Sequence, residues 1–344
     1  MSENLFTGNI SGKRHKLSEV VPLRVPYSIG IWPIYACNFR CTYCMMSIPE
    51  NKRGRYYQNL GKRKMELTLF KKIIDDIKLH QNAHLKTLDF AGMGEPLLHP
   101  ELPSMIAYAK NAGIADCISV YTNASLLRPK LSERITNAGL DRIRISLQGL
   151  DASAYASTSS AKIDFLELKK NIKYLFNHKK HTKVYIKIID ISCNGREDEF
   201  VRHFSDMADD LAIEHLEPLF EGVDYEKFNH LPSTTLHGYP IKKVAVCPQP
   251  FYKLVIAPNG DCFCCCVIHE DTFIGNCNEL ILKDIWNGKL LHEIRTKQLS
   301  KRKNMINACK KCGLYYSLMS PEDNLDDKCD DIMKRLIDTY NTII

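Results

Sequence analysis

The sequence predicts an α/β protein: an incomplete (β/α)6 TIM-like barrel with a small C-terminal cysteine-rich α+β module. Three observations predict this fold. Short β-branched runs alternate with amphipathic stretches from Tyr27 to about Leu219, glycines and polar residues follow several of these runs, and nine of the 14 cysteines lie beyond residue 240. The first two are typical of parallel strands joined by helices, and the third indicates a separate metal or redox unit.

Each unit of the barrel is predicted from its own pattern. Strands are expected over residues 27–36, 85–92, 117–124, 142–148, 183–190 and 213–219, and helices near 67–81, 101–112, 131–138, 164–178 and 197–211. Thr68, Ser132 and Asp164 are residue types that cap the starts of helices. Strands that alternate with helices form a parallel sheet with right-handed crossovers, and six units are too few for a complete eightfold barrel.

Changes in composition divide the chain into five segments. Residues 1–26 form an N-terminal extension, 27–220 the barrel, 221–240 a linker, 241–330 the cysteine-rich module and 331–344 an amphipathic C-terminal helix. The linker is rich in polar residues, glycine and proline, as expected between two packed units.

Composition and charge exclude several classes of protein. The 344 residues are 44% hydrophobic and 25% charged, an ordinary globular mixture that excludes fibrous and disordered proteins. No uncharged apolar run approaches ~18 residues and the N-terminus lacks a signal core, so we predict a cytoplasmic protein with no membrane span. A net charge of +7 without a basic stripe gives no nucleic-acid signature. Disulfides are rare in the reducing cytosol, so the clustered cysteines indicate metal or redox chemistry.

Cys37, Cys41 and Cys44 form a C-x3-C-x2-C motif, CNFRCTYC, directly after the first predicted strand. The carboxyl ends of barrel strands carry the functional residues of such folds. An iron–sulfur cubane prefers four thiolates, so three thiolates leave one iron open to an external ligand. The alternative is a structural zinc site completed by a distant residue, although this spacing is rare for zinc.

The motif resembles the signature of the radical S-adenosylmethionine (SAM) superfamily. In that family three cysteines hold a [4Fe–4S] cluster that binds SAM at its open iron. The reduced cluster then cleaves SAM to methionine and a 5′-deoxyadenosyl radical, which abstracts a hydrogen atom. The resemblance implies that Cys37, Cys41 and Cys44 bind this cluster, that Tyr43 lies near the adenine, and that an external donor such as flavodoxin or ferredoxin supplies electrons.

Three later strand ends resemble the same family. The stretch GMGEP is similar to the family's GGEP, which holds the SAM amino group; TNA is similar to TNG; and SLQG is similar to SLDG, whose serine reaches the ribose. The resemblance implies that the residues binding SAM here are Gly94, Glu95, Asn123 and Ser146. Many relatives also carry an arginine for the SAM carboxylate, but the corresponding stretch at 155–165 has none, which leaves Lys162 or Lys187 as substitutes.

The second cysteine group resembles the SPASM/twitch extension of radical SAM enzymes. Cys247 is followed by twelve residues, Gly260, four residues and Cys265, and later by the C-x2-C pair Cys309 and Cys312. The next family cysteine is replaced by Leu318, so the resemblance implies one auxiliary [4Fe–4S] cluster, held by these four cysteines. A zinc knuckle with the same ligands is the alternative.

Cys262, Cys264 and Cys266 are surplus to this ligand count. Strand alternation places Cys265 on the face opposite Cys264 and Cys266. They are either small buried residues beside a cluster or, for Cys266, a catalytic hydrogen-atom donor to a substrate radical.

Two reactions fit these cofactors. An auxiliary cluster that takes an electron gives a two-electron oxidation (dehydrogenation), whereas a thiol donor gives epimerisation. Only 36 residues precede Cys37, too few for a leader-binding domain, so we expect a sugar or another small molecule as substrate. The basic loop at 52–64 fits either an anionic group on that substrate or a merely solvated loop. The alternatives are a peptide-modifying maturase and a non-catalytic iron–sulfur or zinc protein that binds a partner.

Overall fold

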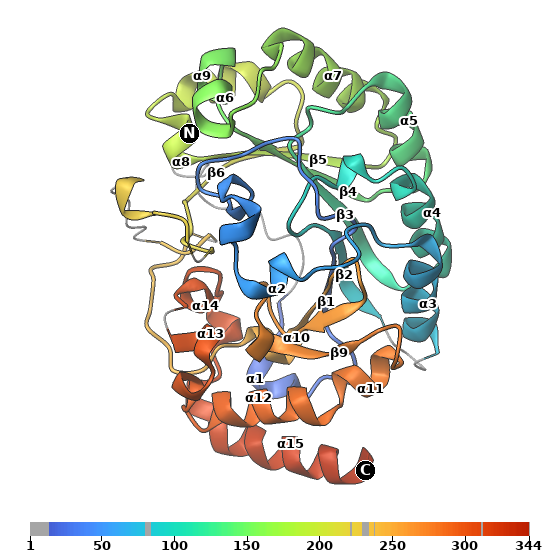
Figure 1. The fold of residues 1–344 in the computed structure, drawn as a ribbon, viewed down its shortest axis with the longest axis vertical. Helices are drawn as coiled ribbons and strands as arrows, with labels where there is room; N and C mark the ends of the chain where they lie inside the picture. The colour runs from blue at the N-terminus through green and yellow to red at the C-terminus, as the bar shows by residue number, and fades with distance from the viewer. Residues whose placement is uncertain are drawn as a thin grey trace.

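One curved sheet of nine strands organises the molecule (Figure 1). The computed structural model describes residues 14–79, 84–220, 222–228, 234–236, 238–310 and 312–343. Within them the strand order is β6-β5-β4-β3-β2-β1-β7-β8-β9, with helices along the outer side of the sheet (Figure 1). The predicted α/β partial barrel with a C-terminal module is confirmed.

The first six strands form the barrel. They are β1 (Ser28–Ile31), β2 (Leu85–Phe90), β3 (Ala115–Thr122), β4 (Arg142–Leu147), β5 (Lys183–Ile189) and β6 (Asp210–Glu214). Each pairs in parallel with the next. The main helices between them are α3 (Leu67–Lys78), α4 (Leu102–Ala112), α5 (Pro129–Asn137), α6 (Ala152–Ser159), α7 (Phe165–His178), α8 (Asp190–Cys193) and α9 (Glu197–Phe204). All six carboxyl ends therefore lie at one edge of the sheet.

Alternation along the strands separates the core from the barrel interior. In β4, Ile143 and Ile145 are fully buried in the main hydrophobic core. On the other face Arg144 lies over the rings of Tyr121 on β3 and Tyr185 on β5, at 5.1 and 5.2 Å. The interior of the barrel is thus lined by polar and aromatic side chains, whereas the helices cover the aliphatic face.

The first and sixth predicted strands differ most from the structure, whereas the other four differ by one or two residues at an end. The first ends at Ile31 rather than at residue 36, because Pro33 lacks the N–H group needed to continue the ladder. The sixth covers Asp210–Glu214 instead of 213–219 and pairs with β5 from Tyr185 onward.

Two of the three predicted helix caps are wrong. Helix α3 begins at Leu67, so Thr68 lies inside it, and Ser132 lies inside α5, which starts at Pro129 with its fixed helical φ. Asp164 does cap α7, because its carboxylate accepts hydrogen bonds from the first backbone N–H groups of the helix.

The C-terminal module continues the barrel sheet. Strand β7 (Lys253–Ile256) pairs in parallel with β1, and β8 (Asp261–Phe263) and β9 (Phe273–Asn276) follow in antiparallel order. Its helices are α10 (Gln249–Tyr252), α11 (Leu282–Trp286), α12 (Lys289–Leu299), α13 (Asn307–Lys310), α14 (Leu314–Ser317) and α15 (Cys329–Ile343). The two units predicted from the sequence therefore share one hydrogen-bonded sheet.

The described part of the N-terminal extension packs on this module. It contains α1 (Leu17–Val20), whose Leu17 joins a cluster with α12 and α15. Arg14 Nη2 donates to both carboxylate oxygens of Asp323 at 2.7 and 2.6 Å, and Trp286 Nε1 donates to Leu23 O at 2.8 Å. Residues from both ends of the chain thus stabilise the same unit.

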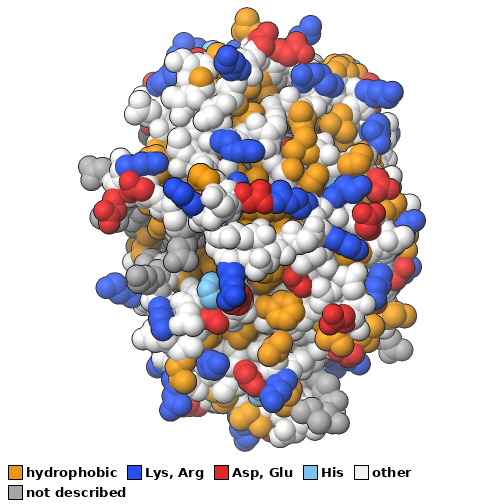
Figure 2. All heavy atoms as spheres, in the orientation of Figure 1, with side chains coloured by type: hydrophobic (Ala, Val, Ile, Leu, Met, Phe, Trp, Pro, Cys, Tyr) orange, Lys and Arg blue, Asp and Glu red, His pale blue; other side chains and the backbone are white. Residues whose placement is uncertain are grey.

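Charged side chains of both signs are interspersed over the face shown in Figure 2. No helix in the described ranges is long and apolar enough to cross a membrane.

Candidate functional site

The C-x3-C-x2-C motif lies in the loop that follows β1. Two backbone hydrogen bonds fix this loop to the end of α6: Arg40 N donates to Ser159 O and Thr42 N donates to Thr158 O, both at 2.8 Å. The position of the cysteines therefore depends on the barrel as well as on the local sequence.

Cys37, Cys41 and Cys44 are three neighbouring thiols that suit an iron–sulfur cluster. Burial raises the pKa of Cys37 to about 11 and raises the pKa of Cys41 and Cys44 as well. Such thiols become thiolates when a metal centre supplies the compensating positive charge. Thiolate sulfur is also the donor that iron–sulfur clusters require, so this donor set fits the predicted group.

Gly94 brings the loop after β2 against the segment that leads to Cys37. A Cβ atom at this position would lie 2.1 Å from Ile34 O and 2.8 Å from Ala36 O. The next residue, Glu95, donates its backbone N–H to Ala36 O at 2.8 Å. Only glycine allows so close an approach, so the two loops form one wall of the site.

The Glu95 carboxylate ties the β2 loop to the end of β3. It is 2% exposed and accepts hydrogen bonds from Thr122 Oγ1 at 2.6 Å, Asn123 N at 2.8 Å and Leu97 N at 3.0 Å. Burial raises the pKa of this carboxyl group to about 7, although the three hydrogen bonds act to lower it. The structure thus gives Glu95 a positioning role that the sequence did not predict, and its contact with SAM stays a prediction.

Asn123 and Ser146 lie at the same edge of the sheet as the cysteine loop. Asn123 Nδ2 donates to Asn38 Oδ1 at 3.0 Å, directly beside Cys37. Ser146 is half-buried near the end of β4. The structure therefore places both predicted residues at the strand ends, and their contact with SAM stays a prediction.

Gln148 follows β4 and was not among the residues predicted to bind SAM. Its Oε1 accepts hydrogen bonds from the Tyr43 hydroxyl and from Cys41 Sγ, the latter at 3.4 Å. It therefore orients two residues of the cysteine motif from the end of β4. The available signal was a polar residue directly after a barrel strand, in the position of the family's aspartate.

The two lysines considered for the SAM carboxylate have different surroundings. Lys187 forms an ion pair with Glu214 on the next strand. Lys162 is exposed and lines a cleft together with Asn38 and Arg128. Lys162 thus lies closer to the cysteine loop than Lys187 does, because Asn38 of that loop lines the same cleft.

The basic loop at 52–64 does not present all its charges outward. Arg53 is buried, where it donates to Tyr35 Oη at 2.7 Å and to two backbone carbonyls, and Arg63 pairs with Glu50. These two cations are used to hold the loop.

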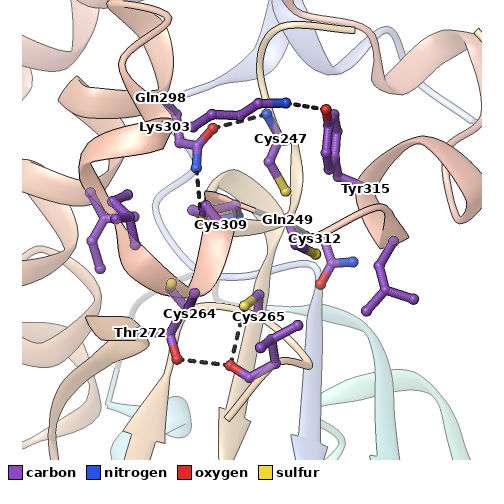
Figure 3. A pocket seen from close by; sticks show the side chains of 16 residues that line it. Cys247, Gln249, Cys264, Cys265, Thr272, Gln298, Lys303, Cys309, Cys312 and Tyr315 are labelled. Atoms are coloured by element: carbon purple, nitrogen blue, oxygen red, sulfur yellow. Dashed lines mark hydrogen bonds between the residues drawn. The ribbon is translucent and has the colours of Figure 1, made fainter. Parts of the chain in front are cut away.

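The four cysteines predicted for the auxiliary cluster line one cavity (Figure 3). They come from three separate segments of the module and are Cys247, Cys265, Cys309 and Cys312. Burial raises the pKa of Cys247, Cys309 and Cys312, that of Cys309 to about 12. The hydrogen bond with Cys264, and burial after it, raise the pKa of Cys265. No three His, Cys, Asp or Glu side chains in the described ranges lie closely enough for a single metal ion. A four-iron cluster is larger than one ion and spreads its thiolates farther apart, so the donor set fits such a cluster.

The predicted alternation of the surplus cysteines is wrong. Strand β8 ends at Phe263, so the pleat stops, and Cys264 and Cys265 both line the cavity. Cys266 is outside the residues that line it, and its Sγ donates to Gln249 Oε1 at 3.3 Å. Cys262 is buried on β8 and its Sγ is hydrogen-bonded to that of Cys277 at 3.2 Å, where either thiol can be the donor.

The comparisons with known proteins agree with both sites. A family model described as the radical SAM superfamily matches residues 33–205, which is half of the chain and contains the first three cysteines. The chain belongs to the radical SAM superfamily. A second model, the SPASM iron–sulfur cluster-binding domain, matches residues 247–313. This radical SAM protein therefore uses a [4Fe–4S] cluster and SAM in its barrel and auxiliary iron–sulfur in its C-terminal module.

Curated relatives match part of this radical SAM protein. The dTDP-4-amino-4,6-dideoxy-D-glucose ammonia-lyase of Streptomyces venezuelae is 32% identical over 149 residues, which cover 43% of this chain and 28% of the relative. The GTP 3′,8-cyclase of Staphylococcus haemolyticus is 32% identical over 152 residues, which cover 44% of this chain and 43% of the relative. The matched region thus spans less than half the length of either relative.

Solved structures share the fold over most of the chain. BtrN in complex with AdoMet and 2-DOIA aligns with a TM-score of 0.55 at 17% identity and covers 84% of this chain and 93% of BtrN. SuiB of Streptococcus suis bound to S-adenosylmethionine aligns with a TM-score of 0.59 at 17% identity and covers 88% of this chain and 74% of SuiB. At these identities the likeness concerns the fold.

Proposed function

We propose that this radical SAM enzyme oxidises a small molecule, such as a sugar, by two electrons. The observation that carries the proposal is the convergence of Cys247, Cys265, Cys309 and Cys312 on one cavity, in a module whose strand β7 is hydrogen-bonded to β1. A cluster held there is a fixed electron acceptor on the same sheet as the radical-forming site.

The reaction balances with the groups at hand. When bound, SAM and the first cluster supply a radical that takes one hydrogen atom from a C–H bond, and the auxiliary cluster takes one electron. The adjacent O–H or N–H then loses a proton, and a C=O or C=N bond forms. The pair formed by His215 and Asp190, 2.8 Å apart after β6 and β5, is the candidate acceptor for that proton, because the carboxylate stabilises the imidazolium.

Epimerisation is the second candidate, favoured by the position of Cys266. Cys266 follows Cys265 in the sequence but is not among the residues that line the cavity. Its thiol is therefore not expected to bind the cluster. A protonated thiol can give a hydrogen atom to the opposite face of a substrate radical. The thiyl radical that remains then takes one electron from the reduced auxiliary cluster and one proton from solvent.

The substrate class is a sugar or similar small molecule. A curated relative, the dTDP-4-amino-4,6-dideoxy-D-glucose ammonia-lyase, carries a sugar in its name. The competing substrate is a peptide, because the fold is shared with SuiB bound to the precursor peptide SuiA. A cytoplasmic location and an external flavodoxin or ferredoxin remain part of the proposal.

The test is a labelled-substrate assay under anaerobic conditions with SAM and dithionite. Deuterated sugars, aminocyclitols and peptides are offered, and 5′-deoxyadenosine is analysed for deuterium by mass spectrometry. Oxidation predicts a product with two hydrogens fewer that still forms in Cys266→Ala. Epimerisation predicts an epimer in which the abstracted deuterium is replaced by a solvent hydrogen, and this product is lost in Cys266→Ala but not in the matched Cys117→Ala. Unlabelled 5′-deoxyadenosine with every sugar and aminocyclitol would overturn the small-molecule proposal.

A further inference from the structure

Helix α12 turns a buried amide toward the auxiliary cavity. Gln298 has 0% of its surface exposed and lies in the cavity wall. Its Oε1 accepts a hydrogen bond from Cys247 N at 3.1 Å, and its Nε2 donates one to Cys309 Sγ at 3.6 Å (Figure 3). One side chain thus contacts two of the four cysteines assigned to the cluster.

Arg295 lies one turn earlier on the same helix and is 4% exposed. Its Nε donates to Pro250 O at 3.0 Å and its Nη1 to Trp286 O at 3.2 Å, and the guanidinium lies 4.2 Å from the centroid of the Trp286 ring. Within the described residues its Nη2 has no hydrogen-bond partner. Buried charges are normally paired, so this cation lacks an anion within the described chain.

The missing anion has a candidate position next to Arg295. Arg295 lies beside the auxiliary cavity, because the carbonyl that its Nε binds belongs to Pro250, which lines that cavity. Four thiolates carry more negative charge than the iron–sulfur core carries positive charge, and reduction adds one further negative charge. A buried cation and hydrogen bonds to ligand sulfur both stabilise the reduced state more than the oxidised state, which raises the reduction potential.

We propose that Arg295 and Gln298 are positioning residues that bias the auxiliary cluster toward its reduced form. The step they favour is a one-electron transfer in which the substrate radical is oxidised, the cluster is reduced and the substrate proton leaves to a base. The inference rests on the proposed function for the source of that electron. Arg295 and Gln298 thus supply part of the driving force for transfer of that electron to the auxiliary cluster.

The test is a redox titration of the reconstituted full-length protein, followed by electron paramagnetic resonance. The signal that changes on addition of SAM belongs to the first cluster, and the other signal is titrated. Arg295→Met is expected to lower the equilibrium constant for one-electron reduction at least tenfold, equivalent to about 59 mV. Arg295→Lys keeps the charge and is expected to retain most of the potential. Gln298→Leu loses the bond to Cys309 and is expected to shift the potential in the same direction.

Lys289→Met is the matched control, because it removes a positive charge from the same helix at a side chain that is 78% exposed. It is expected to leave the potential unchanged. If Arg295→Met and Gln298→Leu both bind wild-type iron and titrate like the wild type, the proposal is wrong. If Arg295→Met loses the cluster, Gln298→Leu decides alone: an unshifted potential overturns the proposal. The titration needs no substrate, so its outcome is independent of whether a sugar is ever oxidised.

Discussion

Replacing Gly94 with alanine tests whether the β2 loop and the cysteine loop share one wall. The new Cβ would lie 2.1 Å from Ile34 O, well inside the 3.0 Å that real Cβ atoms keep. One backbone must therefore move by roughly 1 Å, and overpacking of this kind costs about 1–3 kcal/mol of unfolding free energy. The segment that moves leads directly into Cys37. A misplacement of about 1 Å at a reacting centre lowers the rate by about 100-fold, so we expect that loss in 5′-deoxyadenosine formation.

The assay compares Gly94→Ala with Gly61→Ala, a control in which the added Cβ meets nothing within 4 Å. Both variants are reconstituted anaerobically, and their urea unfolding, SAM affinity and rate of 5′-deoxyadenosine formation are measured. Gly61→Ala should match the wild type in all three. If Gly94→Ala also binds SAM and forms 5′-deoxyadenosine at the wild-type rate, the argument from close approach is refuted.

Three further variants test other parts of the structure. Glu95→Gln replaces one acceptor oxygen with a donor facing buried N–H and O–H groups and should cost about 1–3 kcal/mol in urea unfolding; an unchanged midpoint contradicts this. The hydrogen bond that His215 Nδ1 donates to the Asp190 carboxylate raises the pKa of His215. The stabilisation from this pair is therefore complete below about pH 6.5 and is lost as pH rises through the raised pKa. As pH rises, the free energy of unfolding should therefore fall less in Asp190→Asn than in the wild type. Parallel plots of unfolding free energy against pH would exclude a contribution from the His215–Asp190 pair. Cys309→Ala should lose about four irons per chain yet still form 5′-deoxyadenosine, whereas loss of that product would mean that the two sites are not separate.

The local pattern of the sequence predicts most of the barrel. Alternating β-branched runs and amphipathic helices identify all six units, since burial on one face imposes those periods. It fails where a backbone property overrides the pattern, as at Pro33, which ends β1 early. Pairing between distant segments, such as β7 with β1, depends on packing across more than 200 residues of sequence and has no local signal.

The cysteine spacings predict both clusters of thiols, because the ligands of one cluster must converge. The residues that orient these ligands are less visible in the sequence. Gln148, Gln298 and Arg295 are polar residues of the kind that usually face solvent. Only the packing of the strand ends and of α12 shows that all three are buried, and that Gln148 and Gln298 contact cysteines. The prediction that Cys264 and Cys265 face opposite sides was wrong, because it extended the strand pattern beyond Phe263, where β8 ends.

The central claim is that this chain holds two iron–sulfur clusters of which only the first cleaves SAM. The most direct test is the iron content and 5′-deoxyadenosine yield of the wild type beside a Cys41→Ala, Cys44→Ala variant, both reconstituted anaerobically with SAM and dithionite. The account predicts about eight irons per chain with product for the wild type, and about four irons with no product for the variant. Product from the variant, or none from a wild type with a reducible first cluster, would contradict it.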